Sequence, residues 1–214
     1  METGWITILI IAALPLLMAI TMHEAAHAYA ALKLGDATAA RAGRVTLNPL
    51  SHIDPLGTVL IPGLMLLASG GAFAFGYAKP VPVNFACLRR PKQDMLWVAA
   101  AGPFVNLLMA IAWLLLYNQL PKPPQSELSD AFLQMCIYGI NINLVLMLLN
   151  LLPLPPLDGG RIVTSLLPMR LAIPYSKIEP YGILILLLLL FSGALNAILK
   201  PLLMTTLSLL QTIF

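Results

Sequence analysis

The chain has 214 residues, of which 59% are apolar and only 10% are charged. Soluble domains carry about 25% charged residues, so this composition excludes an ordinary water-soluble protein and indicates a lipid environment. The net charge of +3 at pH 7 is small and is explained by the loops. We therefore expect the lipid bilayer, and not nucleic acid, as a partner. Cys87 and Cys136 form no spaced motif, and we interpret them as unpaired thiols.

Long uncharged segments predict an all-α polytopic membrane protein with about five to six transmembrane or re-entrant helices in a single domain, 1–214. A helix needs roughly 20 apolar residues to cross the hydrocarbon core. In chain order we expect a first helix over 4–32, a short or re-entrant helix over 55–78, a third helix over 94–120, a fourth over 130–157, and a C-terminal helix or helix pair over 180–214.

The two ends of the chain carry separate expectations. The first helix has no positively charged start and no small-residue cleavage site, so we expect it to remain in the mature protein. The tail 201–214 is too short to span alone. It is expected to extend the last helix beyond a bend at Pro201 or to lie at the outer interface.

Positive charges gather in three of the gaps between apolar segments. Cytoplasmic loops carry an excess of lysine and arginine, which assigns these gaps to the cytoplasm. The gap at 122–130, with one lysine and two acids, is assigned to the outside. The cations of the three gaps are Lys33, Arg41 and Arg44, then Lys79, Arg89, Arg90 and Lys92, then Arg161, Arg170 and Lys177.

The sequence His-Glu-Ala-Ala-His, residues 23–27, follows directly on the first apolar run. Residues four apart share a helix face, so His23 and His27 can reach one metal ion with Glu24 beside it. This is the spacing of a zinc site with a general base. The alternative is a pair of interfacial histidines with a solvated glutamate. We favour the metal site because ionisable groups at a membrane segment are costly and usually functional.

A catalytic zinc ion usually takes three protein ligands and an open position for water. The candidates for the third ligand are Asp36, His52, Asp54, Asp94 and Asp158. Asp158 is favoured because it ends an apolar run that three prolines must break, at the depth of the histidines. Its alternative role is the N-cap of the following segment. We interpret His52 as bonding loop backbone rather than as a gate or further ligand.

Together these motifs resemble the site-2 protease family of intramembrane zinc metalloproteases. The resemblance rests on HEAAH at one helix end, NLLPLPPLDGG (150–160) at another, and GRVTLNPLSHIDPLGT, FGYAKPVPVN and AAAGPFVN between them. It covers most of the chain and is strongest to the compact bacterial and archaeal members without PDZ or CBS domains. It implies a protein of the bacterial or archaeal inner membrane, and the distribution of positive charge places the active site toward the cytoplasm.

The resemblance also implies a role for each matching residue. His23, His27 and Asp158 match the family's zinc ligands. Glu24 matches its catalytic glutamate, and Asn150 matches an asparagine thought to steady the substrate or the oxyanion. For Asn150, a buried hydrogen bond between helices is an equal alternative. The implied cofactor is zinc, and the implied substrates are membrane-spanning protein segments.

An extended substrate needs backbone partners, because a helix hides its carbonyls in internal hydrogen bonds. The segments 44–49 and 79–84 contain β-forming residues. We expect them to form a small β element near the cytoplasmic face, one edge of which pairs with the substrate. The alternative is an ordinary membrane-surface loop.

The leading hypothesis is an intramembrane zinc endopeptidase that hydrolyses bonds within or near transmembrane segments, as in regulated intramembrane proteolysis. One alternative is a membrane metal carrier, which would show more ionisable residues along its helices. Another is an inactive protease-like scaffold, against which the intact Glu24 argues. The sequence leaves the oligomeric state open.

Overall fold

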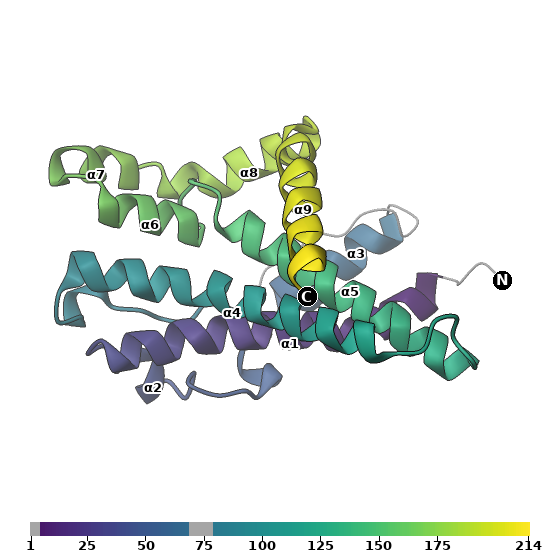
Figure 1. Ribbon diagram of the computed structural model, residues 1–214. Coiled ribbons are helices and arrows are strands. Elements are labelled where there is room, and N and C mark those ends of the chain that lie inside the picture. The colour runs from purple at the N-terminus through teal and green to yellow at the C-terminus, as the bar shows by residue number, and fades with distance from the viewer. Residues whose placement is uncertain (1–4, 69–78) are drawn as a thin grey trace.

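The computed structural model describes residues 5–68 and 79–214 of the chain (Figure 1). Within these residues, five helical segments are long and apolar enough to cross a membrane. They are Thr7–Lys33, Pro91–Gln119, Glu127–Asn150, Met169–Phe191 and Ala194–Ile213. Large apolar side chains are exposed along them, as expected for a protein whose solvent is lipid.

A three-helix bundle forms the centre of the molecule. The helices α1 (Trp5–Lys33), α4 (Pro91–Gln119) and α5 (Glu127–Asn150) each pack against the other two. Close approach of α4 and α5 depends on Gly139, where an added Cβ would lie 2.4 Å from the ring of Trp113. Small residues at helix interfaces allow such contacts in membranes. Residues of α4 and α5, joined by one residue of the C-terminal helix, form one buried apolar cluster: Ala110, Trp113, Leu114, Cys136, Ile140, Leu144, Met147 and Leu210.

Short helices connect α1 to α4. These are α2 (Thr38–Arg41), a 3₁₀ turn at Pro49–Ser51, a π-helical stretch at Pro55–Leu60 and α3 (Ile61–Ala68). The predicted helix over 55–78 is thus helical as far as Ala68, and its remainder, 69–78, lies outside the described residues.

The chain returns to the bundle through a tight turn after α5. Prolines in 151–157 end that helix, and α6 (Asp158–Leu166) then packs against α4. Only glycine fits at the start of α6, because a Cβ at Gly159 or Gly160 would lie 2.3 Å from backbone atoms of the turn. This close packing brings Asp158 back over α1. Two further helices follow, α7 (Met169–Ser176) and α8 (Gly182–Phe191), with a 3₁₀ turn at Glu179–Tyr181 between them.

The final helix crosses the bundle. Gly193 adopts a left-handed conformation with φ of 76°, which glycine reaches without strain, and it separates α8 from α9 (Ala194–Ile213). Figure 1 shows α9 running across α5, which it contacts. Pro201 lies inside α9, so the chain turns at Gly193 and not at the predicted position.

The predicted small β element is wrong, since no strand forms in either of the described ranges, 5–68 and 79–214. Pro80 and Pro82 have no N–H to donate to a sheet ladder. In 44–49 the backbone turns instead of extending, and Asn48 donates its N–H to Thr46 Oγ1 at 3.1 Å.

Three of the four backbone N–H groups in 79–84 are engaged by other parts of the fold. The N–H of Lys79 donates to the His52 carbonyl (3.0 Å), that of Val81 to Glu24 Oε2 (3.0 Å), and that of Asn84 to Asp36 Oδ2 (2.7 Å). These bonds tie the segment to Glu24 of α1, to Asp36 just after α1 and to His52 of the following loop. It lies beside the HEAAH motif as a clamped loop rather than as a strand.

Candidate metal centre

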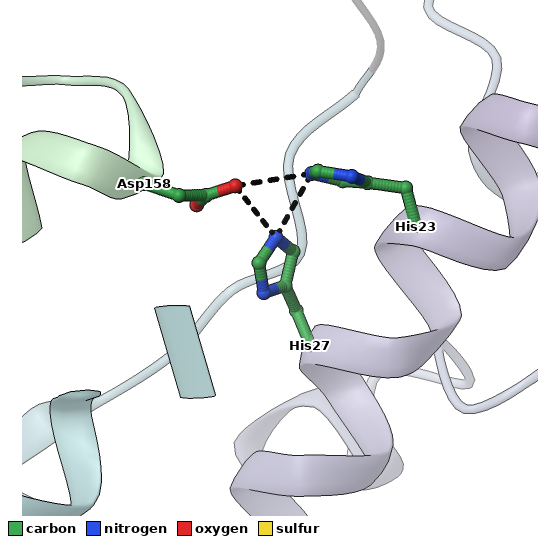
Figure 2. Close-up of side chains that lie close together, drawn as sticks. All are labelled: His23, His27 and Asp158. Carbon is green, nitrogen blue, oxygen red and sulfur yellow. Dashed lines mark hydrogen bonds and ion pairs between the residues drawn. The ribbon is translucent and has the colours of Figure 1, made fainter. Parts of the chain in front are cut away.

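Three buried side chains converge where α1 meets the start of α6 (Figure 2). The Nε2 atoms of His23 and His27 lie 3.0 Å apart. Asp158 Oδ2 lies 3.2 Å from Nε2 of His23 and 3.3 Å from Nε2 of His27. Leu157 occupies the N-cap position of α6, so the Asp158 carboxylate faces the histidines instead of capping the helix.

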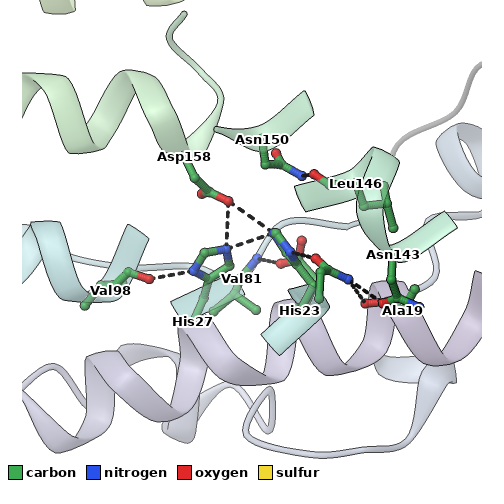
Figure 3. A network of polar contacts seen from close by, with 11 residues as sticks. Ala19, His23, His27, Val81, Val98, Asn143, Leu146, Asn150 and Asp158 are labelled. Atoms are coloured by element: carbon green, nitrogen blue, oxygen red, sulfur yellow. Dashed lines mark hydrogen bonds and ion pairs between the residues drawn. The ribbon is translucent and has the colours of Figure 1, made fainter. Parts of the chain in front are cut away.

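The opposite nitrogen of each imidazole is held by α4. His27 Nδ1 donates to the backbone carbonyl of Val98 at 2.7 Å (Figure 3), and His23 Nδ1 donates to Asn106 Oδ1 at 2.6 Å. A carbonyl oxygen can only accept, so the proton of each neutral ring sits on Nδ1. Both Nε2 atoms therefore present lone pairs toward Asp158.

The convergence of three electron-pair donors calls for positive charge between them. With both ring protons on Nδ1, no hydrogen lies between the two Nε2 atoms, and Asp158 Oδ2 is buried without a hydrogen-bond partner. Zinc binds nitrogen and oxygen ligands at about 2.0–2.1 Å, which separates them by roughly 3.3 Å in a tetrahedral shell. The observed separations of 3.0, 3.2 and 3.3 Å match that spacing. Two imidazoles and one carboxylate thus fit a zinc ion.

The Asp158 carboxyl group is held in its charged form. Burial alone would raise its pKa, but positive charge on the facing His27 ring and the contacts with both rings outweigh burial and hold this pKa well below its usual range. When both Nε2 atoms carry lone pairs instead, a bound cation would supply that charge. The group is therefore a carboxylate at neutral pH, the form in which it binds a metal.

Glu24 lies beside this triangle and opens onto the same cavity of about 130 Å³. It is half-buried, and its Oε2 accepts the N–H of Val81 at 3.0 Å. Asn150 also lines the cavity and donates from Nδ2 to the Leu146 carbonyl of its own helix at 3.0 Å. The cavity is lined by His23, Glu24, His27, Pro80, Val81, Val83, Phe85, Val98, Ala99, Asn150, Pro156, Leu157, Asp158 and Arg161.

The other candidates for a third ligand make backbone contacts elsewhere. Asp36 binds the N–H groups of Thr38 and Asn84. Asp54 and Asp94 accept N–H groups at the starts of their own helices. His52 Nε2 donates to the carbonyl of Thr46 at 3.0 Å, in line with its interpretation as a loop-binding histidine.

Sequence reasoning missed several groups around the site. Asn106 is not among the predicted site residues, and Val81 and Val98 contribute backbone atoms that no side-chain motif can reveal. Gly102 is likewise not among the predicted site residues. The sequence feature that could have indicated Gly102 is a small residue within a membrane helix, since such residues permit close contacts between helices.

Gly102 provides the space for both imidazoles, which gives a testable prediction. An added Cβ would lie 2.4 Å from His27 Nε2 and 2.6 Å from His23 Nε2. We expect Gly102→Ala to displace the rings and to lower cleavage by about 10²-fold, the effect of roughly a 1 Å misplacement. Gly63→Ala is the matched control, because a Cβ there meets nothing within 4 Å. Bound zinc and cleavage rate measured for both variants test this, and a Gly102→Ala protein with unchanged zinc and rate would contradict it.

Comparison with known proteins identifies relatives along most of the chain. The family model described as Peptidase family M50 matches residues 11–193. The protein named "Putative zinc metalloprotease YwhC" from Bacillus subtilis is 40% identical over 191 residues, covering 88% of this chain and 83% of that protein.

Two mycobacterial proteins are more distant matches. Each is named "Putative zinc metalloprotease Rip2". The one from Mycolicibacterium smegmatis is 29% identical over 180 residues, and the one from Mycobacterium tuberculosis (strain H37Rv) is 30% identical over 182 residues. Each alignment covers 84% of this chain and 66% of the relative. No solved structure matches the chain significantly.

Proposed function

We infer the roles of individual residues from one premise: the chain belongs to peptidase family M50 and is an intramembrane zinc metalloprotease of the site-2 protease type. The resemblance predicted from the motifs is thereby confirmed. Zinc is its cofactor, and the buried group of His23, His27 and Asp158 is the part of the described chain that can bind it. Family membership favours this activity over a metal carrier.

We propose that His23, His27 and Asp158 are the zinc ligands. The observation that carries this proposal is the triangle of three ligand atoms 3.0–3.3 Å apart, with Nδ1 of each ring bonded to an oxygen of α4. Zinc bound there supplies a Lewis acid that lowers the pKa of water and polarises the scissile carbonyl. Proton transfer and hydrogen bonding to the substrate are left to the side chains of the protein.

Glu24 is the proposed general base and acid. It follows His23 directly in α1 and opens onto the cavity beside the ligands. The Val81 N–H holds Oε2 in place and leaves Oε1 to take a proton from water. Glu24 then delivers that proton to the leaving amide nitrogen, so that the carboxylate is regenerated after each cleavage.

Asn150 is the proposed donor to the substrate carbonyl. One N–H of its amide bonds the Leu146 carbonyl, and the second N–H of the same group is available to the cavity that it lines. A donor aimed at a developing oxyanion contributes about 3 kcal/mol in other enzymes. The bond to Leu146 fixes the amide on its own helix, which keeps that donor in position.

The proposed substrates are membrane-spanning protein segments, and the proposed site opens toward the cytoplasm. Ten of the cations in the sequence lie in the three gaps at the end of the bundle that carries α2, α6 and α7 (Figure 1). The opposite connection, between α4 and α5, carries one lysine. This asymmetry supports a cytoplasmic assignment for the end with the metal ligands.

Removal of the metal tests the proposed chemistry. Purified protein in proteoliposomes is expected to cleave a tagged single-span protein, to lose that activity on dialysis against a chelator, and to regain it with added zinc. Cleavage products are followed by mass spectrometry, which also locates the bond relative to the membrane. Cleavage that continues after complete zinc removal would refute the zinc mechanism. Cleavage restricted to soluble peptides would refute the proposed substrate class.

A further inference from the structure

A line of buried amide groups runs behind His23, away from the cavity. Asn106 on α4 and Asn143 on α5 are both completely buried. Asn106 Oδ1 accepts from His23 Nδ1 at 2.6 Å, and Asn106 Nδ2 donates to Asn143 Oδ1 at 2.9 Å. Asn143 Nδ2 in turn donates to the Gly139 carbonyl at 2.8 Å. The line therefore ends on backbone of α5.

Backbone carbonyls fix the direction of every bond in this line. The Gly139 carbonyl can only accept, so the nitrogen of Asn143 must face it and the oxygen of Asn143 must face Asn106. Asn106 Nδ2 must then point toward Asn143, and the Ala19 carbonyl at 3.3 Å accepts from the same nitrogen. Only the oxygen of Asn106 remains for His23, and it can only accept a proton from the ring.

The two histidines are thus oriented by different means. His27 donates to a backbone carbonyl, which has no alternative orientation. His23 donates to an amide that could present either its oxygen or its nitrogen. A reversed Asn106 amide would offer N–H groups to Nδ1 and would drive the ring proton to Nε2, where it blocks metal binding.

We propose that Asn106 is a positioning residue for the zinc site, and that Asn143 acts through it, by holding His23 in the tautomer whose Nε2 lone pair faces the metal. This inference rests on the proposed zinc ligands. It assigns a role in metal binding to Asn143, although Asn143 contacts neither histidine. This residue of α5 bonds Asn106 and the backbone of its own helix. Outer partners of this kind typically change metal affinity by about 10- to 100-fold.

The chain supplies a matched set of variants. Leucine resembles asparagine in shape but can neither donate nor accept, so Asn106→Leu and Asn143→Leu break the line. Aspartate is close to asparagine in shape, and at either position it keeps an oxygen that accepts in the original direction, from His23 Nδ1 at position 106 and from Asn106 Nδ2 at position 143. Asn106→Asp and Asn143→Asp are therefore the rescuing variants. Asn141→Leu is the control, because Asn141 also bonds the carbonyl four residues earlier on α5, at 2.8 Å.

The test measures zinc affinity by competition with a chromophoric chelator and the visible absorption of the cobalt-substituted protein. We expect Asn106→Leu to weaken zinc binding by about 10- to 100-fold and Asn143→Leu by about tenfold, each with an altered cobalt spectrum. The two aspartate variants should bind zinc within a few-fold of the unaltered protein, and Asn141→Leu should leave affinity and spectrum unchanged.

The outcomes separate this inference from the proposed function. Unaltered protein that binds no stoichiometric zinc would refute the proposed ligands. Stoichiometric zinc with wild-type affinity and spectrum in both leucine variants would refute the positioning role alone. If a leucine variant loses helical circular dichroism, the aspartate variants decide: weak zinc binding in folded Asn143→Asp and Asn106→Asp proteins contradicts the proposed direction of the bonds.

Discussion

Replacement of Glu24 by glutamine is expected to lower the rate of substrate cleavage by about 10²- to 10⁴-fold, the contribution that general acid–base groups typically make. Glutamine keeps the size of the side chain and an oxygen that can accept the N–H of Val81, but it cannot take up a proton from water. Glu24 is not one of the three residues whose ligand atoms converge. Bound zinc should therefore stay at one equivalent while activity falls.

The measurement is single-turnover cleavage of a tagged single-span protein, with zinc content determined on the same samples. Glu127→Gln is the control, because Glu127 lies in the first turn of α5, at the opposite end of the bundle from α6. Equal cleavage by the Glu24→Gln and unaltered proteins would show that another group transfers the proton. Loss of zinc together with activity would mean that Glu24 acts on the metal instead.

Replacement of Asp158 by alanine is expected to lower both the affinity for zinc and the rate of substrate cleavage. It removes the one carboxylate from the triangle and leaves two neutral imidazoles to hold a divalent cation. The loss of affinity should exceed the about 10- to 100-fold that outer partners contribute, because a direct ligand is removed. Cleavage should fall in parallel, since added zinc would be held without its third ligand.

Equilibrium dialysis against buffered zinc measures this effect. Asp94→Ala is the matched control, because Asp94 is also a buried aspartate but accepts the N–H of Arg90 at the start of α4. Its loss should lower stability by about 1 kcal/mol, as for a helix cap, and leave zinc bound. Unchanged zinc affinity in Asp158→Ala would remove Asp158 from the coordination shell.

The close approach of His23, His27 and Asp158 was predictable from the sequence, because two simple rules lead to it. Helical spacing places His23 and His27 on one face, and the end of an apolar run places Asp158 at their depth. Neither rule specifies which of several acids comes close. The tight turn at Gly159 and Gly160 does that, because it folds the start of α6 back over α1.

The residues that hold the two histidines and Glu24 in place could not be predicted from the sequence, because they depend on contacts between distant segments. Val98 and Val81 act through backbone atoms, so their side chains carry no signal. Asn106 and Asn143 are 37 positions apart, and only the packing of α4 on α5 brings them together.

The β element failed for a local reason that was visible in the sequence. The valines of 79–84 favour a strand, but Pro80 and Pro82 remove two donors from it. The three donors named above are then taken by His52, Glu24 and Asp36. With these three donors engaged, the segment holds Glu24 in place instead of joining a sheet.

The metal environment of the purified zinc-loaded protein tests the central claim most directly, and X-ray absorption at the zinc edge measures it. Two imidazoles and a carboxylate predict one zinc ion surrounded only by nitrogen and oxygen at about 2.0–2.1 Å, with the multiple-scattering pattern of two histidines. A sulfur shell at about 2.3 Å, or a spectrum with fewer than two imidazoles, would place the metal elsewhere and contradict the site described for this chain.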